Sequence, residues 1–182
     1  MTQKILQRFI FLLLVVHFPM VIAISKNWTD EFGDYKVNYL LETKGTEGAD
    51  LSLIVTGVLS DNKIWELRDF VRNCEEDPVL EVIKNSRMLA IDPKSGAQVY
   101  YIAYRVGCVG GIDPLNIKYF AYVGGQKNSL RGEETIICDG SSFGGEKGPV
   151  PDATLKSNPD MLKAMLKKWK AFSIRKCGLN NN

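Results

Sequence analysis

Histidine is almost absent from this chain of 182 residues, whose single copy is His17 near the N-terminus. The common serine and cysteine triads need an imidazole that takes a proton from the nucleophile. Imidazole is also a frequent zinc ligand and the side chain that changes charge near neutral pH. A domain formed by the residues after His17 can have no such triad, no histidine metal site and no histidine pH switch. We therefore expect no enzymatic activity and no cofactor.

The sequence also lacks an unbroken apolar run long enough to cross a membrane. Two basic residues precede an apolar stretch near the N-terminus, but His17 and Pro19 interrupt it, whereas a membrane anchor needs roughly 20 continuous apolar residues. Basic residues, a short apolar core and small residues ending at Ala23 are typical of a secretory signal peptide. We predict that residues 1–23 are removed and that the protein is periplasmic or secreted, with no transmembrane segment after cleavage.

The predicted export leaves a chain of balanced charge. Residues 1–23 carry Lys4 and Arg8 and no acidic residue, so the 23 basic and 21 acidic residues of the sequence become 21 of each. Binding of nucleic acid depends on a surplus of Lys and Arg facing phosphate, and we expect no nucleic-acid partner.

The length that remains after residue 23 suits one domain with a sizeable core. We predict a single domain over residues 24–178 and a disordered tail over 179–182.

Cysteine is sparse, and its spacing fits no metal knuckle. Successive cysteines are 34, 30 and 39 residues apart, far from the CxxC spacing of zinc and redox sites. An even number of cysteines in an exported chain favours disulfides, and four cysteines allow three connectivities. We prefer the sequential pairing, Cys74 with Cys108 and Cys138 with Cys177.

Most of the chain has the pattern of β-strands. β-branched and aromatic residues alternate with polar ones over short runs bounded by turn residues, and such runs separated by short turns favour an antiparallel sheet. The runs cover residues 35–42, 51–59, 63–71, 79–83, 88–91, 99–106, 117–123 and 134–138. Residues 139–157 are rich in Gly, Pro and Ser and predict a long loop or linker.

A helix is predicted after that loop. Asn158 suits the N-cap, Pro159 the first helical position and Asp160 the positive end of the helix dipole. Apolar residues then recur at spacings of three and four up to Phe172, with lysines largely opposite. Such a basic amphipathic helix could lie on a membrane or in a partner's groove. We favour a third position, in which the helix covers one face of the sheet.

Two stretches match catalytic motifs by residue type alone. Residues 140–144 fit the G-x-S-x-G pattern, yet that nucleophile elbow needs a following helix and a histidine acceptor. The acidic residues 75–77 and 133–134 could supply the paired carboxylates of a glycosidase, although acidic pairs in turns are commonly just solvated. A histidine-free hydrolase is therefore kept only as a remote alternative.

Scattered positions resemble a family of exported bacterial proteins. They are Ile64-Trp65, Asp69-Phe70, Cys74, Ile91-Asp92, Gly96, Tyr104 to Cys108, Asp113-Pro114, Lys118, Leu130-Arg131-Gly132, Asn158-Pro159 and Trp169. Over residues 63–170 they are similar to a poorly characterised family whose members are sometimes labelled surface polysaccharide biosynthesis proteins. The resemblance implies bacterial origin and an envelope or extracellular address, and it supplies no catalytic residue. Our candidate binding residues lie within it: Arg105, Asp113, Lys118 and Arg131.

One turn departs from that family. Its members carry acidic residues, asparagine and glycine after the strand near Ile91, similar to the cation-binding turns of integrin-like repeats, in which oxygen ligands hold a hard cation. Here residues 92–96 read Asp-Pro-Lys-Ser-Gly, and Lys94 would repel a cation. We interpret the segment as a hairpin turn and predict no metal site.

The predicted fold is therefore α+β: a twisted, mostly antiparallel sheet, one C-terminal amphipathic helix packed on it, and two disulfides. Glycine-rich loops at 108–114 and 139–157 could recognise a partner, because disulfides keep loops in shape. Our leading hypothesis is a non-enzymatic envelope protein that binds another protein, as an inhibitor or immunity protein does. The alternative is an accessory glycan-binding factor in surface polysaccharide biosynthesis, with four tyrosines as sugar platforms: Tyr100, Tyr101, Tyr119 and Tyr122.

Overall fold

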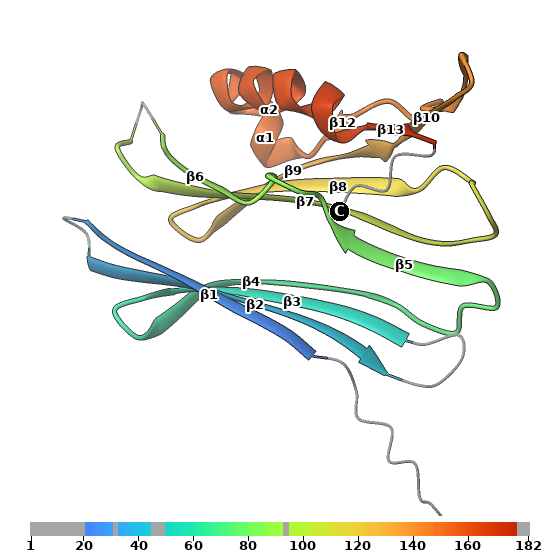
Figure 1. The fold of residues 1–182 in the computed structure, drawn as a ribbon. Helices are drawn as coiled ribbons and strands as arrows, with labels where there is room; N and C mark the ends of the chain where they lie inside the picture. Colours follow the sequence, from blue (N-terminus) through green and yellow to red (C-terminus); the bar gives the residue numbers. More distant parts are fainter. Residues whose placement is uncertain (1–20, 31–32, 45–49, 93–94, 178–182) are drawn as a thin grey trace, which may run out of the picture.

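A computed structural model describes residues 21–30, 33–44, 50–92 and 95–177; the predicted tail and residues 1–20 of the predicted signal peptide lie outside these ranges. Two β-sheets face one another, and two helices cover the outer face of the second sheet (Figure 1). The predicted α+β class with a mostly antiparallel arrangement is confirmed, although the strands divide among several sheets. Among the described residues, no helix has the length and apolar character needed to span a lipid bilayer.

The first sheet is a four-stranded meander. It contains β1 (Val21–Asp30), β2 (Gly33–Lys44), β3 (Asp50–Leu59) and β4 (Asn62–Val71), in the order β1-β2-β3-β4. Leu53 and Val55 of β3 and Leu67 of β4 are buried, whereas their sequence neighbours are more exposed. This alternation is the period-two pattern of a sheet with one buried face, and it explains why β2, β3 and β4 were predicted.

The strand β1 was not predicted. It pairs with β2 along its whole length and begins at Val21, within the predicted signal peptide. Cleavage after Ala23 would leave residues 24–30 in place as a strand.

The second sheet lies at the centre of the molecule. Its strands are β5 (Asp77–Val82), β6 (Met88–Ile91), β7 (Gln98–Val109), β8 (Asn116–Val123), β9 (Gln126–Glu133) and β12 (Val150–Pro151), in the order β12-β9-β8-β7-β5, with β6 also paired to β7. Residues Val99 to Val106 of β7 are buried without interruption. A strand that is covered on both faces loses the alternation seen in β3.

Two cores therefore lie on either side of the central sheet. In the core between the sheets, the Trp65 ring stacks on Tyr122 at 4.1 Å and on Tyr100 at 5.6 Å. In the other core, Tyr119 packs edge-on against Phe172 of the C-terminal helix at 5.1 Å. Aromatic pairs at these distances add to the stabilisation from apolar burial.

The helix α2 (Pro159–Phe172) begins and ends where the sequence predicted. The Asn158 side chain accepts a hydrogen bond from the Met161 amide, which caps the helix. The buried face of α2 comprises Met161, Met165, Trp169 and Phe172. The prediction that the helix covers the sheet is confirmed, and the lysines on its other face are exposed.

The prediction of one long loop over 139–157 was wrong. That segment contains β11 (Ser141–Gly144), β12 and the short helix α1 (Ala153–Lys156). The strand β11 belongs to a third, small sheet in the order β11-β10-β13, with β10 (Thr135–Cys138) and β13 (Ile174–Lys176). These elements are short, so they show little periodicity in the sequence.

Both preferred disulfides are present. Cys74 is bonded to Cys108 and Cys138 to Cys177, and no cysteine of the described residues is free. The first bond joins the connection between β4 and β5 to β7, and the second joins β10 of the small sheet to the segment that follows β13.

Removing the first disulfide should weaken the fold substantially. Its two cysteines are 34 residues apart, and closing a loop of that size restricts the unfolded chain by roughly 3–4 kcal/mol. We expect the double variant Cys74→Ser/Cys108→Ser to lose about that free energy of unfolding in urea. Reduction of the unmodified chain should lower stability at least as much, because it opens both bonds. A double variant as stable as the parent chain would contradict this assignment.

Six buried phenols make the fold sensitive to alkali. Burial is the largest cause that raises the pKa of each, and for Tyr100 it raises the pKa to about 12. An unfolded tyrosine loses its proton near pH 10, so above that pH the unfolded chain binds fewer protons than the folded chain. The free energy of unfolding should therefore be unaffected by these groups below about pH 10 and fall above it. As the pH is raised above 10, phenolate absorbance should increase together with loss of the circular dichroism signal. A complete increase in phenolate absorbance while the chain stays folded would refute the prediction.

Candidate functional site

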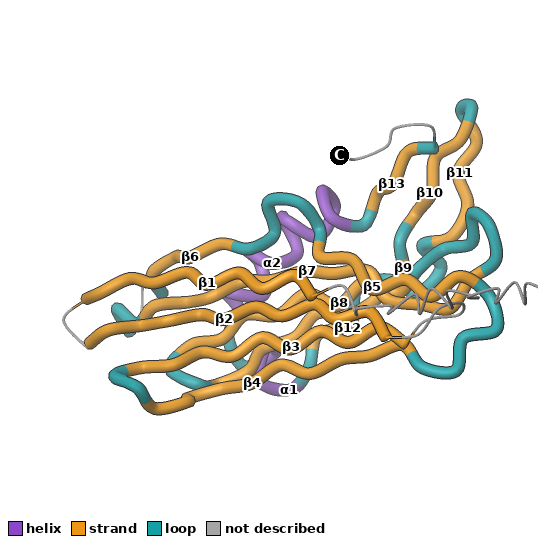
Figure 2. The backbone as a smooth tube through the Cα atoms, turned by 60° about the horizontal axis from the view of Figure 1, so that its bottom comes forward, coloured by secondary structure: helices purple, strands orange, loops and turns teal. Residues whose placement is uncertain are grey.

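A groove opens beside β4, where the two sheets stop covering one another. Trp65 of β4 stacks over Tyr100 of β7 and Tyr122 of β8, so β4 covers the middle of the central sheet. Since β4 is the last strand of the first sheet, the next strands of the central sheet, β9 and β12, extend beyond its edge. Figure 2 shows β4 at this edge of the first sheet.

The groove consists of two adjoining hollows. One has a volume of about 740 Å³ and is lined by the end of β4 and Arg72, by parts of β7, β8 and β9, and by Lys147, Gly148 and Val150. The other has about 500 Å³ and lies over β9, β12 and the start of α1. Arg131 and Val150 line both, so we treat the two hollows as one site, the basic groove. Its cations are Arg72, Lys118, Lys127, Arg131 and Lys147.

The far wall of the groove is held close to its floor. The Glu133 amide donates a hydrogen bond to the Lys147 carbonyl oxygen at 2.9 Å, and Val150 of β12 pairs with Arg131 of β9. Gly132 lies beneath this wall: a Cβ there would come within 2.8 Å of the Lys147 carbonyl oxygen and of the Trp169 ring. Only glycine permits this close approach.

Lys118 is fixed within the groove. Its ammonium lies 2.5 Å from the Asp69 carboxylate of β4, and the Tyr104 hydroxyl donates to the same carboxylate oxygen at 2.6 Å. A charge-assisted pair that joins the two sheets orients the lysine and fixes β4 over β8. Lys118 therefore sets the position of the near wall and leaves part of its charge facing the groove.

Arg131 and Lys127 supply positive charge on the floor of the groove. The Arg131 guanidinium and the Lys127 ammonium lie 5.7 Å and 4.8 Å from the Phe120 ring, which places both on the face of the sheet that carries Lys118. Across the part of the chain that the structure describes, neither forms a salt bridge with a carboxylate. Burial, and then the neighbouring Arg131 charge, lowers the pKa of Lys127.

The one carboxylate among the lining residues is already engaged. Asp152 accepts hydrogen bonds from the Leu155 amide and the Ser129 hydroxyl, both at 2.8 Å, and thereby caps α1. Two apolar side chains are exposed at the rim: Phe70, 51% exposed, and Val150, 64% exposed. A cationic surface with an apolar rim suits a partner that carries carboxylates or other anions.

The structure brings together two of the four predicted binding residues. Lys118 and Arg131 are register partners on β8 and β9. Asp113 is exposed in the β7–β8 connection, away from the groove, and its carbonyl oxygen accepts a hydrogen bond from Arg175 at 3.3 Å. Lys127 was not among the predicted binding residues, although Lys127 and Arg131 differ by four positions on one strand and must share a face.

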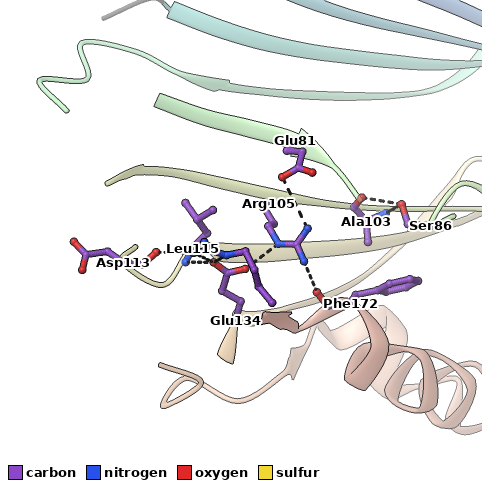
Figure 3. A network of polar contacts seen from close by, with 9 residues as sticks. Glu81, Ser86, Ala103, Arg105, Asp113, Leu115, Glu134 and Phe172 are labelled. Carbon is purple, nitrogen blue, oxygen red and sulfur yellow. Dashed lines mark hydrogen bonds and ion pairs between the residues drawn. The ribbon is translucent and has the colours of Figure 1, made fainter. Parts of the chain in front are cut away.

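Arg105 occupies a buried position instead of a surface one (Figure 3). Its Nε donates to the Glu134 carboxylate at 2.8 Å, and its guanidinium also reaches the Phe172 carbonyl oxygen at 3.3 Å. Glu134 is fully buried, and Arg175 and the Leu115 amide donate to its other oxygen at 2.8 Å and 3.1 Å. This network joins β7, the start of β10, the end of α2 and β13.

The other sequence motifs form turns and hairpins. Residues 140–144 start in a hairpin turn, with positive φ at Asp139 and Gly140, and continue as β11 and not as a helix. In the turn after β6, the Asp92 carboxylate accepts from the Ser95 amide and hydroxyl; Pro93 and Lys94 lie outside the described residues. No cluster of three or more potential metal ligands occurs within the described ranges.

The four tyrosines considered as sugar platforms are all buried. Tyr100 and Tyr122 point into the core between the sheets, and Tyr101 and Tyr119 into the core beneath the helices. They therefore present no open aromatic face to a glycan.

No protein-family model matches the chain, and no curated protein or solved structure is significantly similar to it.

Proposed function

We propose that this chain is an exported, non-enzymatic protein of the bacterial envelope that recognises another protein through the basic groove, in the manner of an inhibitor or immunity protein. One observation carries the proposal. Arg131 and Lys127 lie side by side in a hollow beside Lys118, and among the described residues no carboxylate forms a salt bridge with either of them. The sequence as a whole has nearly balanced charge, so this local surplus favours a partner with a matching acidic surface.

The rim of the groove supports a protein partner. Aromatic side chains and arginine are enriched at protein interfaces. Phe70 lies beneath the guanidinium of Arg72, whose Cζ is 4.1 Å from the ring centre, and Val150 is exposed on the opposite wall. Two disulfides suit a protein that works outside the cytoplasm.

Capture from envelope extracts tests this function. The full chain is cross-linked to proteins from its own species and from competing bacteria, and captured proteins are identified by mass spectrometry. We expect an acidic partner that the variant Lys127→Glu/Arg131→Glu no longer retains. The matched control is Lys163→Glu/Lys167→Glu, which makes the same charge change on the exposed face of α2.

A deletion strain supplies the second criterion. If the partner is a cell-wall-attacking enzyme, loss of this chain should increase sensitivity to it. Equal capture by the groove variant, together with unchanged sensitivity, would refute the proposal.

A further inference from the structure

The strand that borders the groove has a free backbone edge. β4 is the last strand of its sheet, and in the described residues it pairs only with β3. An edge strand directs the N–H and C=O groups of alternate residues outward, where another extended segment can pair with them. The Phe70 amide donates to the Asp69 side chain at 3.0 Å, which fits an outward-directed amide at that residue.

Part of this edge is blocked and part is open. A Cβ at Gly125 would lie 3.0 Å from the Ile64 carbonyl oxygen, so the β8–β9 turn lies against the first half of β4. The second half, residues 66–71, ends in the larger hollow, which Phe70 and Val71 line. The free edge and the basic groove are therefore continuous.

A strand added to β4 would lie over the cations of β9. Neighbouring strands are about 4.8 Å apart and packed sheets about 10 Å, so the added strand would cover the part of the central sheet that β4 leaves open. Its alternate side chains would point toward Lys127 and Arg131, which occupy the same face as Phe120. The remaining side chains would lie beside the exposed Phe70.

We propose that the edge of β4 between residues 66 and 71 binds an extended segment of the partner as an additional strand, with acidic side chains alternating with apolar ones. Backbone pairing supplies affinity, and the cations of the groove select carboxylates, as in other cases of strand addition. This inference rests on the proposed function, because it names the part of the partner that the basic groove receives.

A synthetic peptide of four Glu-Val repeats, blocked at both ends, is the probe. Its binding to the full chain is followed by amide NMR shifts, and we expect the largest changes at Arg68 and Phe70 of β4 and at Arg131. Methylating alternate backbone nitrogens of the peptide removes strand pairing and leaves its charge unchanged. The methylated peptide should bind at least about tenfold more weakly, and a Lys-Val peptide should not bind.

The controls separate this inference from the proposed function. Tetragalacturonate carries the same kind of charge without a peptide backbone, and it should bind at least about tenfold more weakly than the Glu-Val peptide. If the methylated peptide or tetragalacturonate binds as tightly as the Glu-Val peptide, strand addition is wrong. In that case, a loss of binding of either ligand in the variant Lys127→Glu/Arg131→Glu would still support the basic groove as the recognition site. If neither ligand responds to that variant, or no amide of β4 shifts, strand addition is wrong.

Discussion

Replacing Glu134 by alanine should lower the free energy of unfolding by about 3–5 kcal/mol, the cost of leaving a buried ion without its counter-ion. Glu134 is fully buried and receives hydrogen bonds from both Arg105 and Arg175. Without this carboxylate, the guanidinium of Arg105, whose side chain is 5% exposed, keeps among the described residues only Glu81, which lies 3.9 Å away and is 53% exposed. Arg175, at 26% exposure, can turn toward solvent.

Two further variants distinguish loss of the pair from loss of packing. Glu146→Ala removes an exposed carboxylate just after β11 of the small sheet and should change the free energy of unfolding by no more than about 0.5 kcal/mol. Arg105→Met/Glu134→Leu replaces the pair with apolar side chains of similar size and should recover much of the loss. Urea unfolding of the four proteins makes the comparison. If Glu134→Ala unfolded within about 1 kcal/mol of the parent chain, the network would not have the structural role described here.

Reversing Lys127 and Arg131, two groove cations without a salt bridge in the described residues, should abolish binding of the partner. A close charge pair across an interface contributes about 1.5–7 kcal/mol in favourable cases, so Lys127→Glu/Arg131→Glu should weaken the complex by a factor of at least about 100. Neither side chain forms a salt bridge within the described part of the chain, so the reversal breaks no internal ion pair. The unfolding midpoint of this variant should therefore stay close to that of the parent chain.

Salt provides an independent check of the same effect. Affinity of the parent chain should fall as ionic strength rises, because exposed charges are screened beyond about 8 Å at physiological salt. Lys163→Glu/Lys167→Glu should keep both the affinity and its salt dependence. A groove variant that binds as tightly as the helix variant would place the interface elsewhere.

Local features of the fold could be predicted from the sequence. The Asn158 cap, Pro159 and the apolar spacing up to Phe172 define α2 without help from the rest of the chain, and alternation defines β3 and β4. By contrast, β9 buries Asn128 and Ser129, whose polarity conceals the strand. Alternation also shows which residues share a face but not which sheet covers that face, so the division into two facing sheets could not be predicted.

The site could be predicted only in part, because the sequence does not show which strands are neighbours. Lys118 and Arg131 were selected separately, and only the register of β8 with β9 makes them neighbours. Arg105 was taken as a surface residue because its partner, Glu134, is 29 positions away, in the connection between β9 and β10. Lys147 and Val150 reach the groove because residues 146–151 fold back on β9, a tertiary effect that no local pattern encodes.

Hydrogen exchange of the full chain with its captured partner tests the central claim most directly. If the basic groove is the recognition surface, partner binding should slow amide exchange in residues 66–72 and 127–131 and leave the 109–114 loop and the lysine face of α2 unchanged. Protection confined to that loop or to α2, with the groove exchanging as in the free chain, would contradict the account.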